Sequence, residues 1–409
     1  MMNIDNENEL HENLEDEIGE ENDEEAPFDN NVEVPSTFTN MDGTNLNIDD
    51  NWIVSQSTKS YVALPKYLGA LQKFNPGTIV ERCVSRSTDV DEVEFRRVFW
   101  AFAPFIKGFH YCRPVISIDG THLYGKYTGK MLIAMGVNGN NQILPLAFAI
   151  VENESYNTWN WFLSHVKNHV VKDREGICLI SDRHGGILKA VNEHGSPWYC
   201  LRHFINNFYD KFHNSVLKAL AYRAGSQNQI RKFNSIMEEI GKLNPHARHC
   251  LESHPLNRWT LAYDGGRRYG LVTTNLSEIL NSVLKGARFL PITACVQLTF
   301  YRMVHYFEVR RPLGSSSLAN GDAHTPHVIA KQVALMAKAS AHSLRSFNRE
   351  KGIFELITQK GRNVQVVNLE QKTCTCGNRV IIENGVRLSQ GKDLLSAQVQ
   401  ANCDVFLFC

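Results

Sequence analysis

The strongest constraint on the fold of this chain is a series of short apolar runs between residues 115 and 180. The runs are rich in Val, Ile, Leu and Ala, and each is short enough to be a buried strand. They occupy residues 115–118, 131–137, 143–151 and 176–180. Between the third and fourth runs, apolar residues recur every three to four positions from Trp159 to Val170, which predicts a helix. The order strand, strand, strand, helix, strand predicts an α/β domain in which helices flank a mixed sheet.

Two of these runs lead directly into an aspartate. Val115–Ile118 is followed by Asp119, and Cys178–Ser181 is followed by Asp182. If the two strands are parallel neighbours, their carboxyl ends meet in one crevice. Two carboxylates that close repel each other unless a proton or a divalent cation lies between them, and oxygen ligands suit Mg²⁺ or Mn²⁺. The pattern favours a metal site, and the alternative is that each aspartate only ends a strand or opens a turn.

Glu278 is a candidate third carboxylate. The segment from Asn275 predicts a helix whose apolar residues form one stripe, which leaves Glu278, Lys285 and Arg288 on the other face. Such a face can supply one metal ligand and bind a phosphate backbone beside it. Alternatively, Asn275-x-x-Glu278 is a capping box that engages the carboxylate with the helix's own amides.

Charge divides the chain into two parts. Residues 1–50 carry 17 acidic residues and no Lys or Arg, which predicts a disordered acidic tail. Residues 51–409 carry 43 basic and 26 acidic residues, a net charge of +17 that favours a polyanionic partner such as nucleic acid. There is no secretory leader pattern and no run of about 18 apolar residues, so we expect an intracellular protein without a membrane partner.

The remaining organisation follows from spacing and composition. Residues 51–108 predict a small helical leader, including a second amphipathic run at 93–102, and residues 109–311 predict the core. Within the core, residues from about 204 to 270 predict an all-helical insertion. Residues 312–366 predict a linker, marked by Gly314 and three serines, and a helix around 328–347.

Several motifs of this chain resemble the transposase domain of plant Mutator-like elements, and they occur in the family's order. They are Cys112-Arg113-Pro114 running into Asp119-Gly120-Thr121-His122, then Pro145–Glu152 with Trp159, then Ser181-Asp182-Arg183, then Cys200-Leu201-Arg202-His203, and then Arg268-Tyr269-Gly270 with Asn275–Glu278 and Arg288–Ile292. The resemblance covers roughly residues 59–311.

The resemblance implies a ribonuclease-H-like core, with a mixed five-stranded sheet and an all-helical insertion before the last catalytic helix. It implies a D-D-E triad, in which Asp119, Asp182 and Glu278 hold two Mg²⁺ or Mn²⁺ ions for DNA strand cleavage and transfer. The partners implied are DNA, at the element ends and at the target, and further copies of the chain in a homo-oligomer. The expected location is the nucleus.

Basic and aromatic residues beside the triad are candidate DNA contacts. Trp259, Arg267 and Arg268 form a basic aromatic strip, and Lys285 and Arg288 share the helix of Glu278. Arginine binds phosphates and aromatic faces stack on exposed bases. The alternative for the strip is a solvated loop with a core tryptophan.

Two cysteine groups suggest Zn²⁺. Cys200-x-x-His203 is half of a tetrahedral site that His249, Cys250 and His254 could complete, and the alternative is a buried thiol beside a capping histidine. At 367–409, Val367-Asn368-Leu369 and Cys374-Thr375-Cys376 resemble the first half of a SWIM zinc finger. No histidine follows His342, so the second half is missing and an incomplete remnant is expected.

Three functions remain open on the sequence. The three carboxylates favour an active transposase. The missing half of the finger and the acidic start favour a transposase-derived DNA-binding or regulatory protein with a vestigial catalytic site. A non-functional element remnant accounts for the unusual C-terminal residues equally well.

Overall fold

The structure is a computed structural model. It describes residues 50–86, 93–124, 129–183, 185–194, 196–273, 287–320, 324–340, 342–348, 350–357, 364–371 and 373–375. The acidic segment 1–49 lies outside these ranges, so the prediction of disorder stays a prediction. Within the described ranges, no helix combines the length and the apolar character that crossing a membrane requires.

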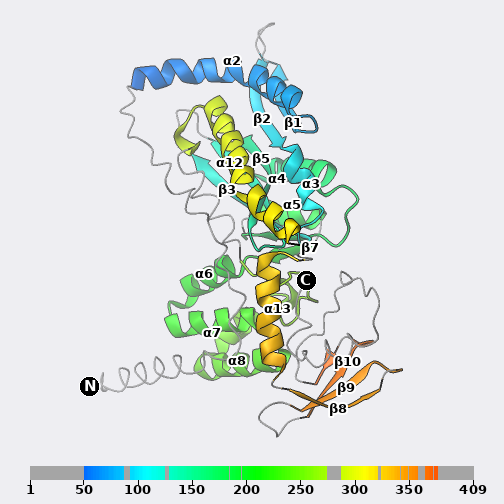
Figure 1. Cartoon of the computed structure of the whole chain (residues 1–409). Coiled ribbons are helices and arrows are strands. Elements are labelled where there is room, and N and C mark those ends of the chain that lie inside the picture. Colours follow the sequence, from blue (N-terminus) through cyan, green and yellow to red (C-terminus); the bar gives the residue numbers. More distant parts are fainter. Residues whose placement is uncertain are drawn as a thin grey trace, which may run out of the picture. The chain divides into compact units, whose positions relative to one another are not determined.

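A seven-stranded mixed sheet forms the centre of the α/β fold (Figure 1). Its spatial order is β1-β2-β5-β4-β3-β6-β7. The strands are β1 (Ile79–Arg86), β2 (Val93–Ala101), β3 (Val115–Leu123), β4 (Gly129–Val137), β5 (Ile143–Val151), β6 (Cys178–Ser181) and β7 (Ser196–Tyr199). In this spatial order, each strand of the series β1-β2-β5-β4-β3 is antiparallel to the next. Strand β6 is parallel to β3, and β7 is parallel to β6.

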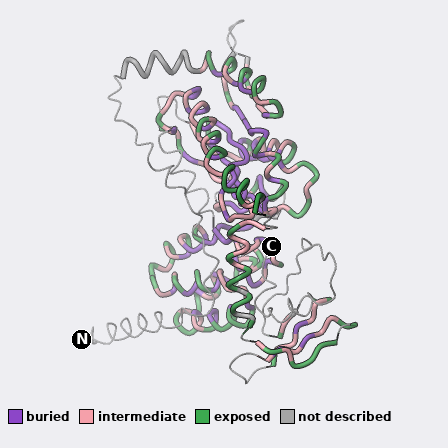
Figure 2. Tube along the Cα trace, viewed as in Figure 1, coloured by how far each residue is buried: buried purple, intermediate pink, exposed green. Residues whose placement is uncertain are grey.

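The middle of the sheet is buried on both faces, because helices cover both sides (Figure 2). Every residue of β5 is buried, which is why its sequence is continuously apolar rather than alternating. Consecutive residues of β2 reach opposite layers. Phe99 packs on Phe162, and Trp100 stacks on Phe148.

The helices that cover the sheet come from segments before, between and after its strands in the sequence. They are α2 (Asp50–Phe74), α3 (Ala103–Phe109), α4 (Tyr156–His165) with the π-helical η2 (Val166–Val171), α5 (Gly185–His194), the 3-10 helix η3 (Ala287–Phe289) and α12 (Ile292–Ala319). Helix α12 runs across one face, where Phe300 contacts Phe102 and Arg310 Nη1 donates to the Ile143 carbonyl at 3.0 Å (Figure 1). The sheet is thus the middle layer of the core.

Residues after β7 form the predicted helical insertion. The helices are α6 (Leu201–Phe212), α7 (Ser215–Ser226), α8 (Ile230–Leu243), α9 (Pro245–Glu252) and α10 (Leu256–Trp259). They share one apolar core, in which Phe204, Phe233 and Trp259 pack together. Asn214 and Asn244 accept backbone N–H bonds at the first turns of α7 and α9, so both helices begin at a side-chain cap.

A second, four-stranded antiparallel sheet follows α13 (Pro326–Ala339). Its order is β11-β10-β9-β8, and the strands are β8 (Ser343–Asn348), β9 (Ile353–Ile357), β10 (Val364–Asn368) and β11 (Thr373–Cys374). Phe354, Leu356 and Val367 form its small core, with Cys374 packed against it.

Three expectations about elements were wrong. The leader at 51–108 contains strands β1 and β2 besides α2, so the sheet has seven strands in the described residues rather than five. The run at 93–102 fits helical spacing, but pairing of β2 with β5 makes it a strand. Residues 312–319 continue α12 through Pro312 instead of beginning a linker, and residues 343–347 belong to β8 rather than to a helix.

Candidate active site

Asp119 and Asp182 lie at equivalent positions on two adjacent parallel strands. The register pairs Ser117 of β3 with Ile180 of β6, and each aspartate follows its paired residue by two positions. Continuing this register by two residues places Asp182, directly after β6, level with Asp119 of β3. Adjacent strands are about 4.8 Å apart, which brings the two side chains to one place. The predicted strand arrangement is confirmed.

Arg288 lies beside the strand that carries Asp119. Its Nη1 donates to Thr121 Oγ1 at 2.8 Å, and its guanidinium lies 5.5 Å from the centre of the Tyr124 ring. The Arg288 carbonyl accepts from the Tyr124 backbone N–H at 2.9 Å. Because Thr121 is two residues beyond Asp119, Arg288 lies on the aspartate face of the sheet.

Glycine at position 120 leaves room for a carboxylate on the opposite face. A Cβ atom added to Gly120 would lie 1.8 Å from Glu154 Oε1. Glu154 lies 3.5 Å from Lys130 Nζ, and both side chains are about four-fifths buried. The glycine after Asp119 therefore allows this ion pair to pack against the strand.

His203, in the first helix of the insertion, interacts electrostatically with both aspartates. Its pKa is raised to about 9, first by a hydrogen bond to Cys200 and then by the negative charges of Cys200, Asp182 and Asp119, while burial acts in the opposite direction. The hydrogen bond and the nearby carboxylates thus favour the protonated form of the His203 imidazole. It lies in the negative field of both carboxylates.

Backbone hydrogen bonds fix the beginning of α6 beside Asp182. The Cys200 N–H donates to the Ser181 carbonyl at 2.8 Å, and the Leu201 N–H donates to the Val272 carbonyl at 2.7 Å. These bonds also place Val272 next to the aspartate end of β6. Val272 and Arg288, which flank residues 274–286 in the sequence, therefore both lie close to the aspartates.

Glu278 and Lys285 fall in residues 274–286, which lie outside the described residues, as does Cys376. Their roles stay predictions. The capping box of Asn275 and Glu278 lies in the same stretch and is also untested.

Trp259 and Arg268 are buried, which corrects the expectation that they contact DNA. Trp259 is 0% exposed and stacks on Phe204 with ring centres 5.0 Å apart. Arg268 is also 0% exposed, and its Nε lies 3.4 Å from Asp264 Oδ2. Packing inside the insertion buries Trp259, as the core-tryptophan alternative states, whereas Arg268 lies against the Trp198 ring and Asp264.

Arg267 is exposed but lies away from the aspartates. It lines a cleft with Lys167, Arg174 and the first residues of β6, including Cys178. Cys178 and Asp182 are at opposite ends of β6, about 13 Å apart along an extended chain. Among the candidate DNA contacts in the described residues, only Arg288 lies at the aspartate end.

Of the two predicted zinc sites, the structure describes both residues of the Cys200 and His203 pair, and of the other pair only Cys374. Cys200 and His203 are hydrogen-bonded, but no third Cys, His, Asp or Glu among the described residues joins them within 4.8 Å. His254 packs edge-on against Phe204, and Cys250 Sγ lies 3.6 Å from Lys211 Nζ. Zinc at Cys200 and His203, and at Cys374 with Cys376, stays a prediction.

Sequence reasoning missed one group of metal-ligand residues. Glu81, His165 and His169 have ligand atoms that all lie within 4.8 Å of one another. The spacing of the two histidines is visible in the sequence, but nothing in the sequence associates Glu81 with them.

A comparison with family models finds one match, to the MULE transposase domain at residues 115–207. The match begins at β3 and ends in α6, and it includes Asp119, Asp182, Cys200 and His203. No curated protein matches the chain. The match supports a transposase-related function, and it agrees with the resemblance to Mutator-like transposases.

Proposed function

We propose that this chain carries the catalytic core of a Mutator-like DNA transposase, which cuts and joins DNA strands with divalent cations held by Asp119, Asp182 and Glu278. The observation that carries the proposal is the register of β3 and β6, which brings the two aspartates level with each other inside the matched segment. The five neighbouring strands β5-β4-β3-β6-β7 support a ribonuclease-H-like core, to which β2 and β1 are added at one edge.

The residues at this end of the sheet fit a divalent cation. Two aspartates side by side supply the hard oxygen ligands that Mg²⁺ and Mn²⁺ prefer. Asp119 lies within β3, and Asp182 directly follows β6, whose last residue Ser181 accepts the Cys200 N–H, so both aspartates are anchored to the sheet. When bound, a pair of such ions activates the attacking hydroxyl and stabilises the leaving oxygen of a phosphodiester.

The flanks of residues 274–286 support Glu278 as the third ligand. Val272 is bonded to the first residue of α6 beside Asp182, and Arg288 is bonded to Thr121 beside Asp119. Both flanking residues thus lie close to the aspartates, and we assign Glu278 as the third ligand.

The chain's own basic residues position the DNA backbone. Arg288 carries a fixed positive charge on the aspartate face, and Lys285 of the same segment adds a second. Arginine and lysine bind phosphates without reading sequence, which suits a site that acts on many targets. Joining two element ends requires more than one active site, so we assign a homo-oligomer. We also assign its activity to the nucleus.

The test is a metal titration of the full chain with supercoiled plasmid, with DNA binding and strand nicking measured in the same samples. Mn²⁺- or Mg²⁺-dependent nicking that EDTA abolishes is the expected result. Asp119→Asn, Asp182→Asn and Glu278→Gln should each remove nicking but leave DNA binding in place.

The matched control is Asp173→Asn, which changes an exposed aspartate between η2 and β6. It should nick like the unmodified chain. DNA binding that persists in EDTA, without nicking in any metal, would overturn the catalytic assignment and support the regulatory alternative. Loss of both binding and nicking in all forms would favour a non-functional remnant.

A further inference from the structure

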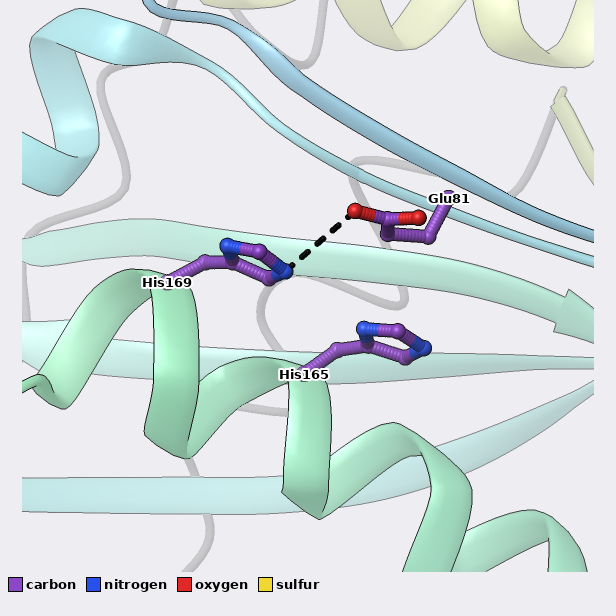
Figure 3. Close-up of side chains that lie close together, drawn as sticks. All are labelled: Glu81, His165 and His169. Atoms are coloured by element: carbon purple, nitrogen blue, oxygen red, sulfur yellow. Dashed lines mark ion pairs between the residues drawn. The ribbon is translucent and has the colours of Figure 1, made fainter.

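Three side chains with metal-ligating atoms converge at the β1 edge of the large sheet. Glu81 comes from β1, His165 is the last residue of α4, and His169 lies in η2. Figure 3 shows the Glu81 carboxylate reaching toward two imidazoles that extend side by side from the helix. The imidazole planes differ by only 8°, with ring centres 5.7 Å apart.

The distances fit a tetrahedral metal ion. His169 Nε2 and Glu81 Oε1 are 3.4 Å apart, and all three ligand atoms lie within 4.8 Å of one another. Two ligands that each lie about 2.05 Å from a tetrahedral zinc ion are about 3.3 Å apart. The pair of Glu81 and His169 already has this separation, and the His165 ligand atom lies within 4.8 Å of both.

The surroundings favour a metal over simple aromatic packing. His165 contacts Phe99 and Trp161, yet its Nδ1 is buried and has no hydrogen-bond partner in the described residues. A buried nitrogen without a partner is costly, and a bound cation would satisfy it. The nearby cation Arg97 does not compete, because its Nε donates to Glu152 at 2.9 Å.

Solvent access and the local helix geometry are also compatible with a bound metal ion. The His169 and Glu81 side chains are 27% and 43% exposed, so an ion can enter from solvent and keep a water ligand. The histidines lie on either side of the change from α-helix to π-helix, and π-helical turns occur frequently at functional sites.

We propose that Glu81, His165 and His169 form a binding site for Zn²⁺, which fastens the edge strand β1 to the helix α4–η2. Two imidazoles and one carboxylate are a known three-residue ligand set for zinc, with water in the fourth position. The two histidines lie in the segment matched by the MULE model, whereas Glu81 lies outside it. The ion therefore links an edge hairpin to the matched core.

This site is separate from the aspartates. Four strand-to-strand steps divide β1 from β3 in the sheet, which is about 19 Å at 4.8 Å per step. The inference does not rest on the proposed function, because it needs neither DNA nor nicking.

The test uses the full chain, freed of metal with EDTA and titrated with Zn²⁺ alone by calorimetry. His169→Gln and Glu81→Gln, both at partly exposed positions, should each bind one equivalent less at micromolar Zn²⁺ than the unmodified chain. Zinc should also raise the melting temperature of the unmodified chain and slow hydrogen exchange at residues 79–86, and both effects should disappear in the two variants.

His246→Gln is the matched control, since His246 is an exposed histidine on α9. It should keep the full stoichiometry. Asp182→Asn should also keep it, which separates this site from the aspartate site. Equal zinc stoichiometry in the unmodified chain, His169→Gln and Glu81→Gln would overturn the proposal and leave an aromatic cluster with an ordinary ion pair.

Discussion

The aspartate end and the histidine edge of the large sheet bring ligands together in different ways. Asp119 and Asp182 come from neighbouring strands, and the hydrogen-bond register aligns them. Glu81 and the two histidines come from a strand and a helix that contact each other through side chains. At the aspartate end the backbone determines the geometry, whereas at the histidine edge side-chain packing determines it.

This difference has a thermodynamic meaning. Strand pairing is part of the sheet core, so the aspartate pair persists as long as β3 and β6 remain paired. The edge strand β1 pairs only with β2 among the described strands, and none of its residues 79–85 is fully buried. A metal ion that binds only the folded edge stabilises it by mass action, so we expect zinc to matter more for stability there than at the aspartates.

The largest effect tests whether the two regions are independent. Asp182→Asn should lower metal-dependent nicking by about three orders of magnitude, as for the loss of a main charge-stabilising group, and should leave zinc stoichiometry unchanged. His169→Gln should lower the zinc stoichiometry and leave metal-dependent nicking unchanged. Nicking assays and zinc calorimetry on both variants measure the crossover, and loss of both properties in either variant would break the comparison.

The second prediction separates residues that build the core of the helical insertion from residues that contact DNA. Trp259→Ala should lower the free energy of unfolding by about 3–5 kcal/mol, because it empties a large buried site next to Phe204. Urea denaturation measures the loss. At temperatures where the variant is folded, its DNA affinity should equal that of Tyr111→Ala, a change at an 84% exposed aromatic residue.

The third prediction concerns the cation at the aspartate end. Arg288→Ala removes the hydrogen bond to Thr121 and the contact with Tyr124, and nicking should fall about tenfold. Arg231→Ala, at an exposed position on α8, is the charge-matched control and should change nicking little. An equal loss in both variants would mean that only the overall charge matters.

The smallest effect is a pair of opposite pH dependences in metal-free protein. The pKa of His203 is raised to about 9, so its stabilising contribution is complete below its unfolded pKa of about 6.5 and is lost as pH rises through 9. Burial lowers the pKa of His165, so protonation destabilises the folded state as pH falls below about 6.5.

Melting curves between pH 5 and 10 check both signs. His203→Gln should flatten the decline of melting temperature on the alkaline side, and His165→Gln should flatten it on the acid side. Shifts of the same sign in both variants would contradict the contrast between the two ends.

The sequence predicted the centre of the fold because burial on both faces leaves a continuous apolar run. Strands β3, β4, β5 and β6 are such runs, and the helix α4 between them keeps helical spacing. Strand β2 was missed because Val93–Ala101 fits both helical and extended spacing, and only its pairing with β5 decides between them.

The aspartate site and the Glu81–histidine site differ in whether a local sequence pattern reveals them. Asp119 and Asp182 could be predicted because each directly follows a short apolar run, a local signal, although β3 continues past Asp119 to Leu123. Glu81 precedes His165 by more than eighty residues, and no local pattern connects them. Trp259 was misplaced because a tryptophan beside arginines has the same sequence appearance in a core and at an interface, and packing against Phe204 decides between them.

The register of β3 and β6 also sets an order of events during synthesis. Sixty-three residues separate Asp119 from Asp182, and the antiparallel strands β4 and β5 are made between them. At about 5–20 residues per second, the ribosome delivers the second aspartate roughly 3–13 seconds after the first. The meander β3–β5 has only short connections to close in that interval, so the nascent chain holds one strand edge open for β6. During those seconds the candidate metal site has only Asp119 of its three proposed ligands.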